Sequence, residues 1–223
     1  MSNNIILPKI RIVSIGNGAF EIVKKVPSIK GVEINYIHVG FARRLFRSFL
    51  SAPFCDTDEE NVKHHFIDLE NVRELGLHPD YMLIYEYFKK RKDLIPEREE
   101  DEYCIVISCL GGNTSSGATL AYFELDKPCV AKSGYDRFNK TDLICTLPHA
   151  FDGKKKMIRA TEWLAKIEKI CNDSYIYHSP ILPISQNTTI KDFFNICDEI
   201  IVKKIIDICN DKISPFKPTI AME

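Results

Sequence analysis

Apolar residues in this chain gather in short continuous runs, and these runs alternate with segments whose apolar positions have helical spacing. The clearest run is Cys104–Leu110 (CIVISCL), which is apolar almost throughout and rich in β-branched residues. Such a run is typical of a strand that is buried on both faces, as in a parallel sheet. Further strands are predicted from similar runs at Ile10–Ile15, Val32–Val39, His64–Leu69, Asp142–Leu147 and Ser174–Tyr177.

The segments between these runs predict helices. In Lys154–Cys171, the apolar residues Met157, Ala160, Leu164 and Ile167 step by three and four positions, which places them on one face of a helix. Other helices are predicted to end near Val26 and to span Phe41–Leu50, Tyr81–Lys92, Ala118–Glu124 and Thr188–Asp211. One side of the last helix is expected to carry Phe193, Cys197, Ile200, Ile201, Ile205 and Ile208.

Strands that alternate with helices predict an α/β fold, a three-layer, Rossmann-like arrangement around a mostly parallel sheet. The chain has 223 residues and is 45% hydrophobic, which is enough to bury the core of such a domain. We expect one domain over residues 1–213, followed by a short tail, residues 214–223, in which Pro215 and Pro218 disfavour further helix.

The loop after the central strand has the composition of an anion-binding loop. Residues 111–117 read GGNTSSG and connect the strand to a helical segment. Glycines allow the backbone to approach a ligand closely, N–H groups at a helix start attract phosphate, and hydroxyl groups add donors. An ordinary strand-to-helix connection with a Ser or Thr cap explains the loop equally well.

A second glycine loop follows the first predicted strand. Gly16, Asn17 and Gly18 connect that strand to a helix, which is how a nucleotide-binding α/β domain begins. A single Gly-x-Gly is a weak signal, and a plain tight turn is the simpler interpretation of this loop.

Composition excludes several other classes of function. The formal charge is −1 and the sequence pI is about 6.6, so no bulk electrostatic attraction to nucleic acid is expected. No apolar run approaches the roughly 18 residues that a membrane span needs, and the N-terminal residues lack the layout of a signal peptide. The eight cysteines contain no Cys-x-x-Cys pair, which predicts free thiols and a cytoplasmic protein.

In the order of its parts, the chain resembles the GTPase half of the FtsZ/tubulin superfamily from about Lys9 to about Asn210. The family's GGGTGTG signature loop corresponds to residues 111–117, and its KPFxFEGxxR segment resembles LPHAFDGKKK at residues 147–156. Three shorter motifs match in the same order. The family's GVEF strand resembles GVEI at residues 31–34, its GANPE turn resembles GLHPD at residues 76–80, and its DAFGAAND segment resembles DFFNICDE at residues 192–199.

This resemblance implies a site for GTP or GDP, with Mg²⁺ as its metal ion. The signature loop would cradle the phosphates, and the first glycine loop would approach them. Phe194 would stack on the base, although an aromatic residue at helical spacing is also typical of a core, and Asp198, with Glu199 beside it, would hydrogen-bond the edge of the base. Asp152 and Lys156 would lie near the ribose and phosphates. The nucleotide-binding residues implied in this way are Gly16, Asn17, Gly18, Gly111, Gly112, Asn113, Thr114, Ser115, Ser116, Gly117, Asp152, Lys156, Phe194 and Asp198.

The chain also departs from the family pattern. Asn113 and Ser115 replace two signature glycines, and the family's Asn-Thr-Asp segment falls at residues 38–40 (HVG). The sequence ends near the acidic loop with which FtsZ activates water on a neighbouring subunit's GTP. We therefore expect no catalytic residue here and at most weak or partner-dependent GTP hydrolysis. The expected role is that of a regulatory or partner subunit for itself or another FtsZ-like protein, in a tubulin-like, cell-division-type or membrane-associated assembly.

Three other interpretations remain open at this stage. The first is a pseudo-GTPase scaffold that no longer binds nucleotide, because the loop substitutions remove donors or add side chains where a ligand should lie. The second is a metal site, because the four histidines of the predicted strand-to-helix loops would meet at one edge of the sheet, although their spacing matches no zinc pattern. These histidines are His38, His78, His149 and His178. The third is a dinucleotide-dependent oxidoreductase, which the missing third glycine of the first loop disfavours.

Overall fold

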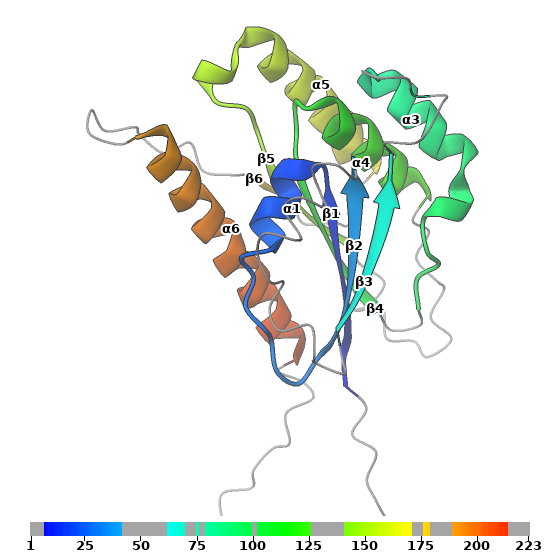
Figure 1. Cartoon of the computed structure of the whole chain (residues 1–223), viewed down its shortest axis with the longest axis vertical. Coiled ribbons are helices and arrows are strands. Elements are labelled where there is room, and N and C mark those ends of the chain that lie inside the picture. Colours follow the sequence, from blue (N-terminus) through cyan, green and yellow to red (C-terminus); the bar gives the residue numbers. More distant parts are fainter. Residues whose placement is uncertain are drawn as a thin grey trace, which may run out of the picture.

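A single sheet of six parallel strands forms the centre of the protein (Figure 1). The computed structural model describes residues 7–41, 62–69, 75, 79–99, 102–125, 141–170, 176–178 and 189–213. Across these residues the strand order is β3-β2-β1-β4-β5-β6, and every neighbouring pair is parallel. The strands are β1 (Lys9–Ile15), β2 (Glu33–Gly40), β3 (Val62–Asp68), β4 (Glu102–Cys109), β5 (Thr141–Thr146) and β6 (Ile176–His178).

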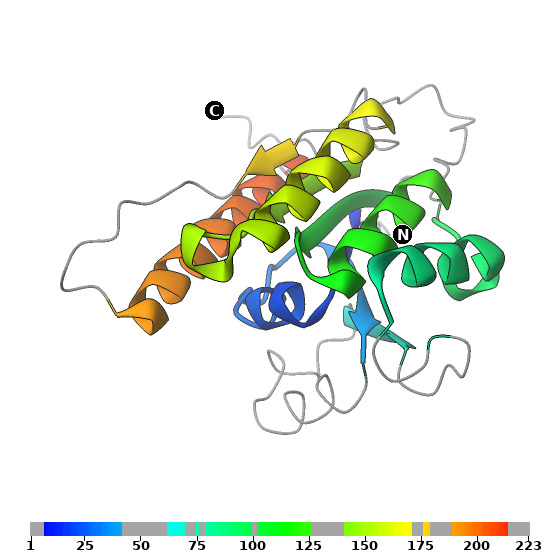
Figure 2. The ribbon, with the colours of Figure 1, turned by 90° about the horizontal axis from the view of Figure 1, so that it is seen from above.

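Helices cover both faces of this sheet, so the molecule has three layers (Figure 2). Helices α3, α4 and α5 pack on one face, and α1 and α6 pack on the other. The helices are α1 (Asn17–Val23), α3 (Tyr81–Lys90), α4 (Asn113–Leu125), α5 (Lys154–Ile170) and α6 (Ile190–Ile213), with short 3₁₀ turns at Lys92–Leu94 and Ala150–Asp152.

The continuous apolar runs are explained by burial on both faces. Along β4, Cys104 and Val106 belong to the core beneath α3, α4 and α5, whereas Ile105 and Ile107 belong to the core beneath α1 and α6. Successive side chains of a strand point to opposite faces, so a strand covered twice needs apolar residues at nearly every position. The predicted fold class, a Rossmann-like α/β domain with a parallel sheet, is confirmed.

One helix start differs from the prediction. Helix α4 begins at Asn113 rather than Ala118, because Ser115 and Ser116 in its first turns are buried and the Oγ of Ser116 accepts a 3.1 Å hydrogen bond from the N–H of Gly111. Helix α3 begins at Tyr81 as predicted, and its N-cap is Asp80, whose Oδ1 accepts a 2.8 Å hydrogen bond from the N–H of Leu83.

The prediction for one side of α6 was wrong at a single position. Ile200 is 38% exposed, whereas Phe193, Cys197, Ile201, Ile205 and Ile208 are buried as expected. Ile200 and Ile201 are neighbours on the helix, about 100° apart, so only one of them can face the sheet. The predicted helix at 41–50, the segment 126–139 and the tail at 214–223 lie outside the described residues, apart from Phe41.

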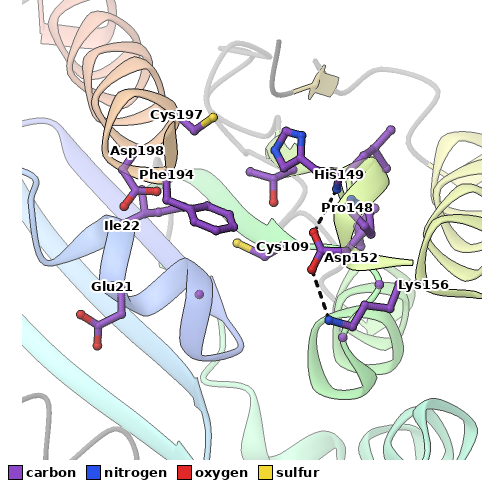
Figure 3. Close-up of a pocket in the computed structure, with 16 residues that line it drawn as sticks. Glu21, Ile22, Cys109, Pro148, His149, Asp152, Lys156, Phe194, Cys197 and Asp198 are labelled. Atoms are coloured by element: carbon purple, nitrogen blue, oxygen red, sulfur yellow. Dashed lines mark hydrogen bonds and ion pairs between the residues drawn. The ribbon is translucent and has the colours of Figure 1, made fainter. Parts of the chain in front are cut away.

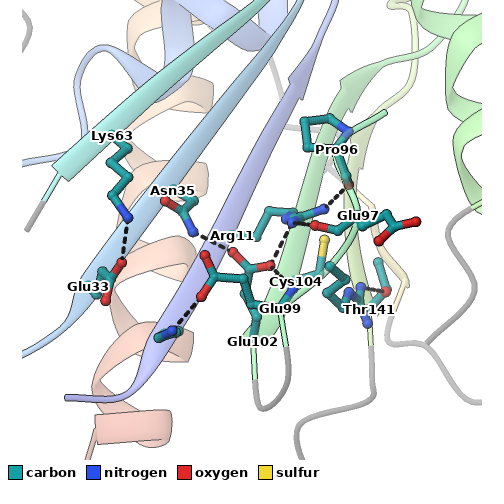
Figure 4. A network of polar contacts seen from close by, with 12 residues as sticks. Arg11, Glu33, Asn35, Lys63, Pro96, Glu97, Glu99, Glu102, Cys104 and Thr141 are labelled. Atoms are coloured by element: carbon teal, nitrogen blue, oxygen red, sulfur yellow. Dashed lines mark hydrogen bonds and ion pairs between the residues drawn. The ribbon is translucent and has the colours of Figure 1, made fainter. Parts of the chain in front are cut away.

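A buried polar network lies at the amino-terminal end of the sheet (Figure 4). Arg11 of β1 and Glu102 of β4 form an ion pair of 2.7 Å between Nη2 and Oε2. The guanidinium also donates to the main-chain oxygens of Pro96 and Glu97, and the amide of Asn35 donates to Glu102. These contacts connect β2, β1, β4 and the segment that leads into β4, at the end of the sheet opposite the glycine loops.

Candidate functional site

The strand order creates a crevice at the carboxyl end of the sheet. From β1, the chain builds outward in one direction through β2 and β3 and in the other direction through β4, β5 and β6. Helix α1 follows β1 onto one face, and α4 follows β4 onto the other face, so the two glycine loops diverge between these strands. In open parallel α/β sheets, ligands bind at this point of reversal.

A cavity of about 330 Å³ lies at this position (Figure 3). Its lining comes from α1, from the ends of β4 and β5 with the loops that follow them, and from the first turns of α6. The lining residues are Gly18, Glu21, Ile22, Cys109, Leu110, Gly111, Gly112, Thr146, Leu147, Pro148, His149, Asp152, Lys156, Phe194, Cys197 and Asp198.

Half of the predicted nucleotide-binding residues line this cavity. They come from four separate segments of the sequence and are Gly18, Gly111, Gly112, Asp152, Lys156, Phe194 and Asp198. The other half lies in the two glycine loops and the first turns of α4 but does not line the cavity; these residues are Gly16, Asn17, Asn113, Thr114, Ser115, Ser116 and Gly117.

Two glycines have backbone conformations that other residues rarely adopt. Gly16 has a φ of 87° and Gly111 a φ of 96°. A Cβ on Gly111 would lie 2.5 Å from the Cγ of Pro148 and 3.2 Å from the main-chain oxygen of Lys156, so the segment after β5 packs directly on this loop. The N–H groups of both glycines are engaged, because that of Gly16 donates to the oxygen of Val39 and that of Gly111 to the Oγ of Ser116.

The polar residues at the start of α4 also bond within the protein. The Nδ2 of Asn113 donates to the oxygen of Pro79 at 3.1 Å, and its Oδ1 accepts from Arg159 of α5. A Cβ on Gly117 would lie 2.1 Å from the main-chain oxygen of Tyr81, so this glycine permits the close packing of α4 on α3. Asn113 and Gly117 therefore hold elements of the fold together.

The opposite end of the cavity is aromatic. Phe194, which is 42% exposed, lies at the mouth with His149, Phe151 and Phe193 around it. His149 packs edge-on against Phe193, with ring centroids 4.3 Å apart. Of the two adjacent phenylalanines, Phe193 is buried in the core, whereas Phe194 has part of its ring exposed and accessible to a ligand.

Acidic side chains outnumber basic ones in the lining. Glu21, Asp152 and Asp198 contribute carboxylates, and Lys156 is the one basic residue among the lining residues. Lys156 forms a 3.3 Å ion pair with Asp152, and Asp198 forms a 2.6 Å ion pair with Lys25. The lining residues alone therefore carry a negative formal charge, but each carboxylate is paired with a lysine, Glu21 with Lys24 at 3.4 Å.

Cys109 lies at the end of β4, between the aromatic end of the cavity and the glycine loops (Figure 3). Burial raises the pKa of its thiol to about 11, so the thiol is protonated at neutral pH. A Cβ on Gly18 would lie 3.0 Å from its Sγ, which shows how closely α1 packs on β4 here. The cysteines of the described segments, Cys109 among them, are free thiols, as predicted.

Of the four histidines, the two whose side chains the structure describes, His38 and His149, are not brought together in a common site. His38 lies inside β2 rather than in a loop, where it is fully buried and its Nδ1 is 2.7 Å from the Oγ of Ser14. His149 lines the cavity, His178 ends β6, and His78 falls outside the described residues. Within the described segments, no three His, Cys, Asp or Glu side chains are grouped as metal ligands.

Sequence reasoning missed part of the lining. Glu21 and Ile22 face the cavity from α1, and Cys197 faces it from α6, one turn after Phe194. Thr146 is the last residue of β5, and Leu147 and Pro148 follow it, at the end of the strand where a parallel sheet is expected to build its binding site. The location of these three residues at the end of a predicted strand was therefore the sequence signal from which they could have been predicted.

Comparison with known proteins points to one superfamily. No family model matches the chain. The sequence is 28% identical over 213 residues to the cell division protein FtsZ of Aquifex aeolicus, covering 93% of this chain and 52% of that protein. The fold matches the M. jannaschii FtsZ dimer at a TM-score of 0.64 and 18% identity, covering 91% of this chain and 55% of that one. It also matches CetZ2 from Haloferax volcanii, a GTPγS-bound protofilament, at a TM-score of 0.61 and 14% identity, covering 96% and 60%.

The fold is thus that of the nucleotide-binding domain of FtsZ- and tubulin-like proteins. These matches bear out the predicted resemblance to the FtsZ/tubulin superfamily. The chain spans about half the length of these relatives. No helix within the described segments has both the length and the apolar character needed to cross a membrane.

Proposed function

We propose that this protein binds a guanine nucleotide in the cavity at the carboxyl end of its sheet and acts as a partner or regulatory subunit of an FtsZ-like assembly in the cytoplasm. One observation carries the proposal. Residues that a resemblance to FtsZ selected from four distant segments line a single cavity at the point where α/β sheets of this type bind ligands.

The lining suggests a role for each end of the cavity. Phe194 is exposed enough to stack on a base, and the Oδ1 of Asp198 can accept from a base edge while Oδ2 pairs with Lys25. Gly111 and Gly112 would lie beside the sugar and phosphate, at the amino-terminal end of α4, where the helix dipole favours negative charge. Asp152 and Lys156 would contact the ribose or phosphate from the start of α5.

We propose that autonomous GTP hydrolysis is weak or nil. Phosphoryl transfer needs positioned positive charge and an oriented water molecule. The basic residue in the lining is neutralised by Asp152, and the carboxylate of Asp198 is held by Lys25. A metal ion such as Mg²⁺ would supply positive charge to the phosphates. Assembly with itself or another FtsZ-like chain is supported by the relatives described as an FtsZ dimer and a CetZ2 protofilament.

A second candidate function is a pseudo-GTPase scaffold that has lost nucleotide binding. The observation that favours it is the excess of acidic over basic residues in the lining, which opposes a polyanionic ligand. The two candidates differ in one measurable property, the affinity for nucleotide.

Calorimetric titration of the purified protein with GTP, GDP and ATP, with and without Mg²⁺, separates them. Binding of guanine nucleotide that is lost in Gly112→Asp supports the first candidate, because the added carboxylate would lie at the cavity wall and its Cβ only 2.9 Å from the Oγ of Ser115. A urea unfolding curve for the variant confirms that it is folded. Absence of binding at millimolar nucleotide in the unaltered protein would leave the scaffold as the function.

A further inference from the structure

We propose that the cavity accepts a nucleoside with at most one phosphate and discriminates against di- and triphosphates, and that Ser115 determines this specificity. This inference rests on the proposed nucleotide site and specifies which class of nucleotide enters it. Three features of the described residues carry it, namely the position of the Ser115 side chain, the engaged N–H groups of the two glycine loops, and the charge of the lining.

The side chain of Ser115 fills the space between the two glycine loops. The residue is only 6% exposed although it lies in the first turn of α4. Its Oγ is 3.2 Å from the position of a Cβ on Gly16 and 2.9 Å from that of a Cβ on Gly112. The hydroxyl group of Ser115 therefore occupies the space between the loops in which phosphates would lie. The lining of the cavity includes Gly112 but not Gly16 or Asn17.

Two N–H groups of the glycine loops are used within the protein. The N–H of Gly16 donates to Val39 at 2.8 Å, and that of Gly111 donates to Ser116 at 3.1 Å. A chain of phosphates needs several convergent donors, so these two engaged groups reduce what the cradle offers. Gly112 lines the cavity immediately before α4 begins at Asn113, which suits the binding of one phosphate at the start of that helix.

Charge acts in the same direction. Each phosphate beyond the first adds negative charge near Glu21, Asp152 and Asp198. The lysines that pair with these carboxylates, Lys24, Lys156 and Lys25, are already engaged, so a further phosphate would have to compete for them. Like charges a few ångströms apart repel in a partly dry cavity, and the repulsion grows with each added phosphate. A nucleoside or nucleoside monophosphate keeps the contacts at the aromatic end and avoids most of this repulsion.

The experiment is a calorimetric series with guanosine, GMP, GDP and GTP, in the presence of Mg²⁺, on the unaltered protein and on Ser115→Gly. We expect the unaltered protein to bind GMP about tenfold or more tightly than GTP, and Ser115→Gly to gain about tenfold in affinity for GTP with little change for GMP. Ser115→Ala should give a smaller gain, because the Cβ itself lies 3.5 Å from the same point on Gly16. Urea unfolding of each variant shows that it is folded, and the alanine variant provides the test if the glycine variant is not.

The outcomes separate this inference from the function on which it rests. Equal or tighter binding of GTP than of GMP by the unaltered protein overturns the inference but leaves the nucleotide site in place. A preference for GMP that neither substitution weakens shows that Ser115 is not the determinant. If guanosine, GMP, GDP, GTP and their adenosine counterparts all fail to bind both the unaltered protein and Ser115→Gly, the nucleotide site itself is wrong.

Discussion

Replacing Glu102 with glutamine removes one charge from a buried ion pair and keeps the shape of the side chain. In the folded protein, the side chain of Glu102 is 0% exposed and that of Arg11 is 3% exposed. The guanidinium remains fixed by the main-chain oxygens of Pro96 at 2.8 Å and Glu97 at 2.7 Å. The Glu102→Gln protein must therefore bury a cation whose counter-charge is gone.

The expected cost follows from burial. Removing one partner of a buried ion pair typically costs about 3–5 kcal/mol. We expect about 3 kcal/mol for Glu102→Gln, because the two carbonyl contacts to Arg11 persist and the amide oxygen can still accept from Asn35. The loss is a large part of a domain's stability, which is about 5–15 kcal/mol. Arg11→Met should cost a similar amount, and the double variant Arg11→Met with Glu102→Leu less than the sum of the two single changes.

Urea unfolding followed by circular dichroism measures these differences as shifts of the midpoint at constant slope. The matched control is Glu33→Gln on β2, whose 3.1 Å pair with Lys63 is much more accessible to solvent, with Lys63 65% and Glu33 23% exposed, so its loss should cost under about 1 kcal/mol. A cost for Glu102→Gln as small as that of the control would refute the reasoning, since it would show that Arg11 does not depend on this carboxylate.

Two further predictions concern the histidine inside the sheet and the aromatic end of the cavity. Burial lowers the pKa of His38 from 6.5 to about 3. Between pH 3 and pH 6.5, the histidine is therefore protonated in the unfolded chain and neutral in the folded chain. The contribution of neutral His38 to the free energy of unfolding should be fully present above pH 6.5 and should fall by up to about 1.4 kcal/mol per pH unit as the pH decreases toward 3. Urea titrations at several pH values should find a weaker pH dependence in His38→Phe. Phe194→Ala should weaken nucleotide binding by about 1–3 kcal/mol and have little effect on the free energy of unfolding. Phe193→Ala, which truncates the buried neighbour, should lower the free energy of unfolding by about 3–5 kcal/mol. Equal losses of stability in the two variants would contradict the assigned positions.

The fold could be predicted from sequence because hydrophobic periodicity reports burial directly. β4 was recognised from its uninterrupted apolar run, and the structure explains that run by two helical layers. The start of α4 was less predictable. Ser115 and Ser116 look like loop residues, but both are buried in the fold, and the hydroxyl of Ser116 accepts a hydrogen bond from the N–H of Gly111. Such burial depends on tertiary contacts that no local pattern contains.

The candidate site was predictable in its parts and less so in its geometry. The resemblance to FtsZ identified Phe194 and Asp198 together with the glycines Gly18, Gly111 and Gly112, and the structure places these five residues around one cavity. Nothing in the sequence showed that Lys25 pairs with Asp198, because these residues are far apart in the chain and meet only when α6 packs beside α1. Likewise, the burial of Ser115 between two loops follows from their spacing in three dimensions.

The cavity is assembled from segments that span nearly the whole sequence, from Gly18 in α1 to Asp198 in α6. During synthesis, its last wall is made only when α6 leaves the ribosome and docks on the sheet. No fragment that ends before this helix can contain the complete cavity, and any fluctuation that detaches α6 opens it. A ligand held there would therefore resist the release of this helix, so occupancy should be seen as slower proteolysis and hydrogen exchange in α6 and as a higher melting temperature of the whole domain.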